Sequence, residues 1–219
     1  MNENPTALVV VAHHRRDSLT VHIADQVTAR LKEAGYAVDV LDLHAEDFDP
    51  LMTVADQPDW DDRDKVYSEP AQAHQRRILA ADAIIPVFPI YWFSVPAVLK
   101  GWIDRVWGYG FAYGRSKPRL AGKKMLWLGL GGAADDDDES VPAMQEAMDT
   151  TLRDGVSRYC GIDEAAVEML LNAEAQPQTI DEHGNLVVGE AMSGEARRAH
   201  YAELDRRARD HVAKFLGLV

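Results

Sequence analysis

The chain has 219 residues, of which 47% are hydrophobic and 27% charged, so its composition is that of an ordinary globular protein and excludes wholesale disorder. It carries 23 Lys and Arg residues against 36 Asp and Glu residues, and the resulting charge of −13 argues against nucleic acid as a partner. A single cysteine, Cys160, excludes an intrachain disulfide and any CxxC pair, and it favours a reducing compartment.

The N-terminal residues 1–5 have neither a positively charged start nor a long apolar stretch, so no signal peptide is predicted. No segment approaches the roughly 18–20 apolar residues that a membrane span needs. We therefore expect a cytoplasmic protein.

Hydrophobic periodicity predicts strands that alternate with helices along the whole chain. In chain order the predicted strands cover residues 7–12, 37–42, 83–88, 123–130 and 166–171. The predicted helices cover residues 21–34, 71–81, 95–107, 141–153 and 195–216, and Asp181–Asn185 has the composition of a hairpin turn. This alternation predicts one α/β domain over residues 1–219, a doubly wound five-stranded parallel sheet with helices on both faces.

Two acidic segments interrupt this pattern. Residues 46–69 are predicted to form a long irregular excursion, either a solvated loop or a lid or partner-binding arm. The run Asp135–Glu139 is interpreted as a solvated acidic loop rather than a cation site, because its spacing matches no EF-hand. No metal site is predicted.

Three segments follow the first, third and fourth predicted strands, at the edge where a doubly wound sheet binds its ligand. The first, His13–Thr20, places hydroxyl and basic side chains at a helix N-terminus, where free amides and the helix dipole favour a phosphate. A simple N-cap by Asp17 or Ser18 is an equally good interpretation.

The second segment, Phe88–Pro96, has three aromatic residues in a proline-bounded loop, which either wall a flat ligand or fill core or an interface. The third segment, Gly129–Ala134, formally satisfies the G-x-G-x-x-A pattern, but it does not open the first βαβ unit. We interpret its glycines as positions where the backbone comes close to a ligand.

The run FPIYWFSVPAVLKGWIDRVW over residues 88–107, followed by Gly110-Phe111-Ala112-Tyr113, resembles the signature of the flavodoxin-like NAD(P)H:quinone oxidoreductases. That family includes the mammalian DT-diaphorase type and the bacterial ancillary oxidoreductases of potassium efflux systems. The resemblance covers residues 7–132 and includes Ala12-His13 followed by Ser18.

The resemblance implies a flavodoxin-like fold, a homodimer, and one FAD or FMN per subunit with NAD(P)H as the electron donor. It implies that the flavin contacts lie in the three loops named above, at His13, Ser18, Leu19, Thr20, Pro89, Ile90, Tyr91, Trp92, Phe93, Gly131 and Gly132. Tyr113 and Phe111 would form the aromatic rim of the substrate pocket, and Trp102, Val106 and Trp107 would lie near the dimer contact.

The chain also departs from the family. Gly129-Leu130 stands where the family usually has Thr-Thr, and the following segment lacks the Tyr and His of the mammalian type. No general acid or base is therefore assigned, and Arg115 is an untested substitute.

The expected function is two-electron, ping-pong hydride transfer from NAD(P)H through a flavin to quinones or similar acceptors. The alternative is a regulatory ancillary subunit of a potassium efflux transporter, associated peripherally with it through residues 46–69. An electron-carrier flavodoxin is disfavoured, because no T-x-T-G-x-T phosphate loop is present.

Overall fold

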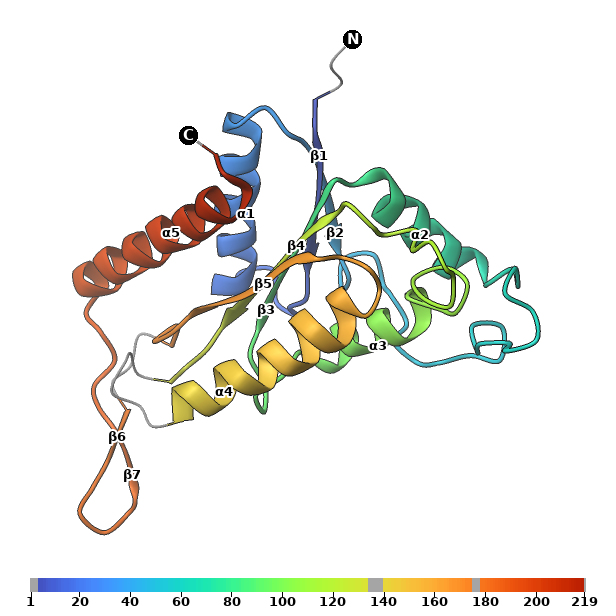
Figure 1. Ribbon diagram of the computed structural model, residues 1–219. Coiled ribbons are helices and arrows are strands. Elements are labelled where there is room, and N and C mark those ends of the chain that lie inside the picture. Colours follow the sequence, from blue (N-terminus) through green and yellow to red (C-terminus); the bar gives the residue numbers. More distant parts are fainter. Residues whose placement is uncertain (1–3, 134–139, 175–177, 219) are drawn as a thin grey trace.

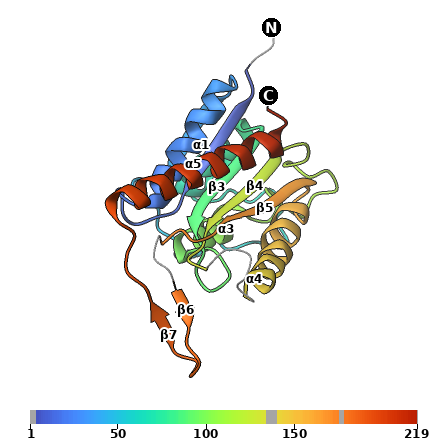
Figure 2. The same ribbon diagram turned by 90° about the vertical axis from the view of Figure 1, so that its left-hand side faces the viewer.

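A computed structural model shows a parallel sheet between two layers of helices (Figures 1 and 2), and it describes residues 4–133, 140–174 and 178–218. The five strands are ordered β2-β1-β3-β4-β5 and all pair in parallel. They are β1 (Thr6–Val11), β2 (Ala37–Asp42), β3 (Ala83–Pro89), β4 (Lys124–Leu130) and β5 (Glu164–Leu170). The predicted doubly wound α/β sheet is confirmed.

Each face of the sheet has its own hydrophobic core. The helices α1 (Leu19–Glu33) and α5 (Gly194–Leu216) cover one face, and α2 (Glu69–Ala80), α3 (Ala97–Val106) and α4 (Ser140–Met148) cover the other (Figure 1). Along β1, Leu8 and Val10 pack into the core on the α3 side, whereas Val9 packs into the core beneath α1 and α5. Such burial on both faces is why the strands are continuous apolar runs rather than alternating ones.

A proline lies inside the central strand β3. Pro86 has no N–H to donate, and it is paired with Val10 of β1. On the other side the ladder pairs Ile84 with Met125 and resumes at Val87 with Leu128, so it omits the proline. The sheet thus accommodates Pro86 by interrupting one of its two ladders.

The helix that follows β4 differs from the prediction. A helix over residues 141–153 was expected, but α4 continues as a π-helix, η1 (Asp149–Arg158). The amide of Tyr159 donates to the Asp154 carbonyl, five residues back, at 3.1 Å. The hydroxyl of Ser157 donates to the Leu152 carbonyl at 2.8 Å and accepts from the Trp127 indole at 2.9 Å, which anchors the wide turn to β4.

The α3 residues expected near a dimer contact belong to the core of the chain itself. Trp102 and Val106 are fully buried, and Trp107 is 4% exposed. They fill the space between α3 and the sheet, so they offer no surface to a second subunit.

Two segments extend beyond the layered core. The excursion over residues 43–68 contains no helix or strand, and its Asp56 is ion-paired with Arg105 of α3 at 2.8 Å. A hairpin of β6 (Gln178–Ile180) and β7 (Leu186–Val188), joined by the predicted turn, projects away from the sheet (Figures 1 and 2). The acidic run Asp135–Glu139 lies outside the described residues. In the described ranges, no helix combines the length and apolar character required to cross a bilayer.

Candidate functional site

Two adjoining cavities lie at the carboxyl edge of the sheet, next to the switch point between β1 and β3 where the chain order reverses. The helix-side cavity, of about 220 Å³, lies by the N-terminus of α1 and is lined by His13, Leu19, Thr20, Pro89, Ile90, Tyr91, Leu130, Gly132, Ala173 and Glu174. The turn-side cavity, of about 410 Å³, is lined by Ile90, Trp92, Phe93, Gly131, Gly132, Ala133, Ser140 and Met144. Ile90 and Gly132 line both cavities, so the two form one continuous site.

The first loop brings a helix N-terminus to the helix-side cavity. Ser18 is the N-cap of α1, and its hydroxyl accepts from the Val21 amide at 3.3 Å. Leu19 and the buried Thr20 then begin the helix and face the cavity. The capping role of Ser18 and a phosphate site are compatible, because a capped α1 still directs the positive end of its dipole toward the cavity.

His13 stands at the entrance to that loop. Its Nδ1 accepts from the Arg15 amide at 3.0 Å, and its ring stacks on His14 at 4.6 Å. Partial burial, and then the nearby His14, lower the pKa of His13 below its ordinary value. The imidazole is therefore neutral at pH 7 and keeps one ring N–H for a ligand.

The second loop is a tight turn with an unusual composition. Tyr91 and Ser94 exchange two backbone hydrogen bonds of 3.0 Å, and the two central residues have positive φ, +52° at Trp92 and +58° at Phe93. This is the geometry of a type I′ turn, in which Asn and Gly are preferred. Trp92 is 99% exposed. Two aromatic residues in left-handed backbone conformations are strained, and such strain concentrates at functional sites.

The glycines after β4 serve two purposes. A Cβ on Gly129 would lie 2.7 Å from the Ile90 side chain, so this glycine makes room for Ile90 rather than for a ligand. Gly131 and Gly132 line the turn-side cavity, where the missing Cβ leaves room for a ligand, although a Cβ on Gly132 would also lie 2.8 Å from the Glu174 side chain. The prediction of ligand contacts therefore stays with the pair and does not extend to Gly129.

The lining of the site fits a flat, apolar ring with a polar edge. The backbone amides of Trp92, Phe93 and Gly132 donate to no acceptor among the residues that the structure describes. Ile90 and Met144 supply an apolar surface beside these free donors. A flavin ring combines an apolar face with carbonyl and ring-nitrogen acceptors along one edge, so the residues present fit that group.

Phe111 and Tyr113 lie elsewhere in the chain. They follow the far end of α3, and neither lines the helix-side or the turn-side cavity. Phe111 is 4% exposed, whereas Tyr113 packs against Tyr109 and Tyr159, each with ring centroids 5.8 Å apart. Burial, and then Tyr159, raise the pKa of Tyr113, so its phenol remains protonated.

Several residues that line the site were not expected from the sequence. Ala173 and Glu174 follow β5, and Ser140 and Met144 belong to α4. The strand order could have indicated Ala173 and Glu174, because the carboxyl end of β5 lies at the same edge as that of β4.

A further cleft of about 570 Å³, the α1–α5 cleft, meets the helix-side cavity at Leu19 and was not expected. No cluster suited to a metal ion occurs within residues 4–133, 140–174 and 178–218.

Comparisons with known proteins agree with this geometry. A family model described as a flavodoxin-like fold matches residues 5–186. The Escherichia coli K12 NAD(P)H oxidoreductase YcaK is 41% identical over 167 residues, which are 75% of this chain and 82% of that protein. Rat NAD(P)H dehydrogenase [quinone] 1 is 31% identical over 71% of this chain, and the match spans 64% of the length of the rat enzyme.

Solved structures show the same fold at lower identity. The NAD(P)H:quinone oxidoreductase of Methanothermobacter marburgensis has a TM-score of 0.72 at 22% identity and covers 95% of this chain and 97% of its own. General stress protein 14 of Treponema denticola, described as a complex with FMN, has a TM-score of 0.64 at 23% identity and covers 98% of this chain and 100% of its own. On the family model and the bacterial relative, the chain belongs to the flavodoxin-like NAD(P)H oxidoreductases.

Proposed function

We propose that this chain is a flavin-dependent enzyme that oxidises NAD(P)H and reduces quinones or similar acceptors by two-electron, ping-pong hydride transfer. The observation that carries the proposal is the continuous site at the sheet edge, where an apolar wall adjoins the free amides of Trp92, Phe93 and Gly132. The names of the relatives agree with this activity. A flavin supplies the hydride-accepting and hydride-donating chemistry when bound.

In this proposal the protein positions the cofactor and excludes water. Thr20 and the first amides of α1 hold the flavin phosphate, with neutral His13 as a hydrogen-bond donor beside it. Pro89, Ile90 and Tyr91 support the ring, and Gly131 and Gly132 leave room at its edge. Trp92 and Phe93 shape the open face that donor and acceptor occupy in turn.

We propose FAD rather than FMN as the cofactor. The α1–α5 cleft continues from the helix-side cavity and is lined by Ser18, Leu19, His22, Arg198 and Tyr201, among others. Tyr201 offers an aromatic surface and Arg198 a cation, which suit an adenosine diphosphate half, whereas FMN would leave this cleft empty. Chromatography of the heat-released flavin decides between the two, and FMN as the only product would contradict this assignment.

We further propose a homodimer in which Tyr113 completes the site of the partner, whereas Phe111, which is 4% exposed, stays in the core of its own chain. Within one chain Tyr113 lies away from the two cavities, so a second copy would have to bring it to a flavin. Light scattering should give twice the mass of the chain. A fully active monomer would contradict this arrangement.

Because reduced nicotinamide nucleotides are intracellular, we place the enzyme in the cytoplasm.

One observation favours the second candidate function, a regulatory subunit of a transporter. The excursion exposes apolar side chains to solvent, with Val54 85% and Val66 76% exposed. A surface of this kind is suited to contact with another protein, including a transporter. Co-purification from membranes would support this second role, and it is compatible with catalysis.

The visible spectrum of the purified protein tests the leading proposal. Oxidised-flavin absorbance bands are expected, and protein that stays colourless after incubation with FAD and with FMN would overturn the proposal.

Substitution of two aromatic residues separates flavin binding from turnover. Trp92→Ala should lower both flavin retention and turnover, because Trp92 borders the turn-side cavity. Tyr113→Ala should retain its flavin and lose catalytic efficiency by roughly 1–3 kcal/mol of transition-state stabilisation. Flavin-to-protein ratios and kcat/KM for NADH, NADPH and a benzoquinone measure these effects. If Tyr113→Ala loses its flavin while Trp92→Ala keeps it, the roles assigned to Trp92 and Tyr113 are wrong.

A further inference from the structure

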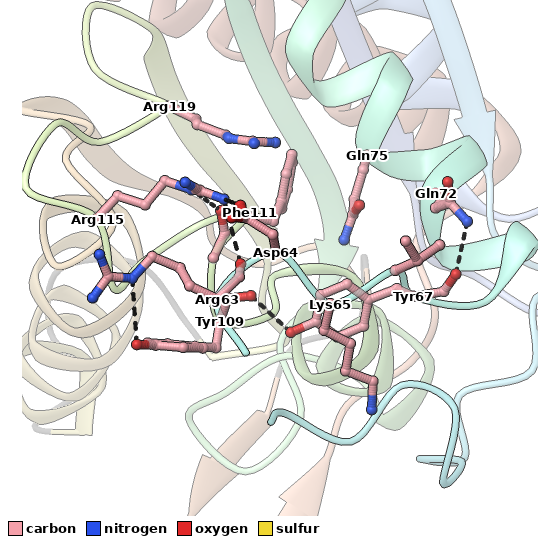
Figure 3. A pocket seen from close by; sticks show the side chains of 12 residues that line it. Arg63, Asp64, Lys65, Tyr67, Gln72, Gln75, Tyr109, Phe111, Arg115 and Arg119 are labelled. Carbon is pink, nitrogen blue, oxygen red and sulfur yellow. Dashed lines mark hydrogen bonds and ion pairs between the residues drawn. The ribbon is translucent and has the colours of Figure 1, made fainter. Parts of the chain in front are cut away.

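A separate cavity of about 180 Å³ lies away from the flavin site, between the excursion, α2 and the loop after α3 (Figure 3). We call it the basic cavity, because its charged lining residues are Arg63, Lys65, Arg115 and Arg119 against one carboxylate, Asp64. This local excess of positive charge occurs in a chain with a formal charge of −13. An anion is therefore the ligand that this surface would attract.

Among the described residues, three of these cations form no ion pair with a carboxylate, although Asp64 still acts electrostatically on Arg63 and Arg119. Arg119 makes no hydrogen bond or ion pair with any residue that the structure describes. The Arg63 side chain donates to the Tyr109 hydroxyl at 3.4 Å and lies over the Tyr109 ring, with Cζ 6.0 Å from the centroid, and Lys65 donates to the Gln57 carbonyl at 2.6 Å. Only Arg115 is ion-paired, with Asp64. Elsewhere, arginines such as Arg77 and Arg153 are each shared between two carboxylates.

The walls of the cavity are fixed by contacts between segments far apart in sequence. The Arg115 guanidinium donates to the Gly110 carbonyl, and Gly110 contacts the Arg63 backbone so closely that a Cβ there would lie 1.8 Å from the Arg63 oxygen. The Tyr67 hydroxyl donates to the Tyr109 carbonyl at 2.8 Å. These contacts fix the backbone that carries Arg63 and Arg115 before any ligand arrives.

The neutral groups on the other side add no negative charge. Figure 3 shows Arg115 and Arg119 extending from one side of the cavity, with Gln75 and Tyr67 on the opposite side. Burial raises the pKa of Tyr67 to about 12, so its hydroxyl is not an anion at neutral pH. Among the described residues, Asp64 is thus the only carboxylate that lines the cavity and opposes an incoming anion.

We propose that the basic cavity binds a phosphate group as its dianion. Guanidinium groups bind phosphate oxygens through two parallel hydrogen bonds, and the volume suits one such group rather than a whole nucleotide. Two sources share this chemistry, the 2′-phosphate of NADPH and free inorganic phosphate. The first source rests on the proposed function, because it requires the nucleotide to be a substrate.

The direct test is calorimetric titration of the full-length holoprotein with inorganic phosphate at an ionic strength held constant with chloride. Wild-type protein should bind phosphate saturably. The double variant Arg63→Gln, Arg119→Gln should bind at least on the order of tenfold more weakly. Arg197→Gln is the matched control, because Arg197 is an exposed arginine of α5 whose side chain has no partner among the described residues. No saturable binding by the wild type, or equal binding by the double variant, would overturn the proposal.

A second variant should act in the opposite direction. Asp64→Asn removes the carboxylate from the cavity and releases Arg115 from its ion pair, so phosphate should bind more tightly than to the wild type. Weaker phosphate binding by this variant would mean that the Asp64 carboxylate does not oppose the anion, and it would contradict the proposed phosphate site.

Kinetics then distinguish the two sources of phosphate. If NADPH supplies it, the ratio of kcat/KM for NADPH to that for NADH should fall in the double variant and stay unchanged in Arg197→Gln. If free phosphate is the ligand, the titration shows the loss while this ratio is unaltered. The titration requires no turnover, so the two proposals fail separately: protein that takes up neither FAD nor FMN but still binds phosphate through these arginines would overturn the proposed function and leave this site standing.

Discussion

The turn at Trp92-Phe93 and the ion pair of Asp56 with Arg105 show two opposite uses of local structure. The turn lies at the proposed flavin site, with two aromatic residues at positive φ and one of them 99% exposed. The ion pair lies beneath the excursion, where Asp56 is fully buried and Arg105 is 5% exposed. The turn therefore destabilises the folded chain, whereas the ion pair holds a long loop in place.

The difference shows where this fold carries strain. A short loop between a strand and a helix is positioned by its ends, so β3 and α3 can hold the turn in a conformation that its residues disfavour. The 26-residue span 43–68 is too long to be positioned by its ends alone, and hydrogen bonds to the Asp56 carboxylate from Arg105, Thr53 and Ser68 help to fix it. Four measurements test whether the turn is strained and whether Asp56 holds the excursion in place.

The largest effect is expected for Asp56→Ala. This change removes the acceptor for Arg105 Nη2 at 2.8 Å and for the Ser68 amide at 3.0 Å, and it leaves the buried guanidinium with the more distant Asp49 carboxylate, 3.6 Å from Nη1. The free energy of unfolding in urea should fall by roughly 3–5 kcal/mol. Asp104→Ala, which removes the exposed pair with Lys100 on the same helix, is the control and should cost less than about 1 kcal/mol. Equal losses would show that the excursion is held by other contacts.

A smaller loss is expected for Gly110→Ala. Gly110 has φ +79°, and an added Cβ would lie 1.8 Å from the Arg63 carbonyl oxygen, so the excursion must move. We expect a cost of roughly 1–3 kcal/mol and faster proteolysis of residues 43–68. Gly35→Ala isolates the contact, because Gly35 has φ +86° but no atom within 4 Å of an added Cβ. If Gly110→Ala and Gly35→Ala lose the same unfolding free energy, the whole effect comes from the positive φ and not from the contact with Arg63.

A gain in stability is expected from Trp92→Asn combined with Phe93→Gly. Asn-Gly suits the positive φ values of a type I′ turn, so the apoprotein should gain about 1–2 kcal/mol. Flavin retention should fall, because both aromatic side chains line the turn-side cavity. Tyr91→Asn, in the same turn but without a positive φ, should give no such gain in a thermal melt. If the double variant is less stable, the turn is not strained.

The pH dependence of the ion pair is the smallest effect. Burial alone would raise the pKa of Asp56, but hydrogen bonds from Ser68 and Arg105 outweigh it and leave the pKa below its ordinary value. A lowered pKa in the folded protein stabilises the fold above the unfolded value of about 3.9, and that contribution is lost as the pH falls through the folded value. The difference in unfolding free energy between wild type and Asp56→Asn should therefore shrink on acidification, and parallel curves would contradict this.

The sheet and its binding edge could be predicted because their signals are local. The run Ala7–Ala12 is apolar and β-branched, and Ser18 precedes a helical pattern that it then caps. The π-helix could not be predicted, because η1 has the same apolar spacing as an α-helix and differs in hydrogen bonds that Ser157 helps to hold.

The site is less predictable than the fold. Nothing in Trp92-Phe93 indicates positive φ, since the residues that favour it are Asn and Gly. The basic cavity joins Arg63 and Arg119, which approach one another only after the excursion docks on α3. Phe111 and Tyr113 carry a family signature, yet the folded chain places them away from the cavities that they were expected to border.

The lone cysteine makes the native chain suitable for selective labelling with fluorophores. Cys160 is 5% exposed, and burial raises the pKa of its thiol to about 11, so at pH 7.5 fewer than about one thiol in a thousand is the reactive thiolate. A cysteine introduced at an exposed position, such as Val54 of the excursion or Val188 of the hairpin, would react with a maleimide dye well ahead of it. Distances from a dye to the flavin could then be followed by energy transfer without first removing the native thiol.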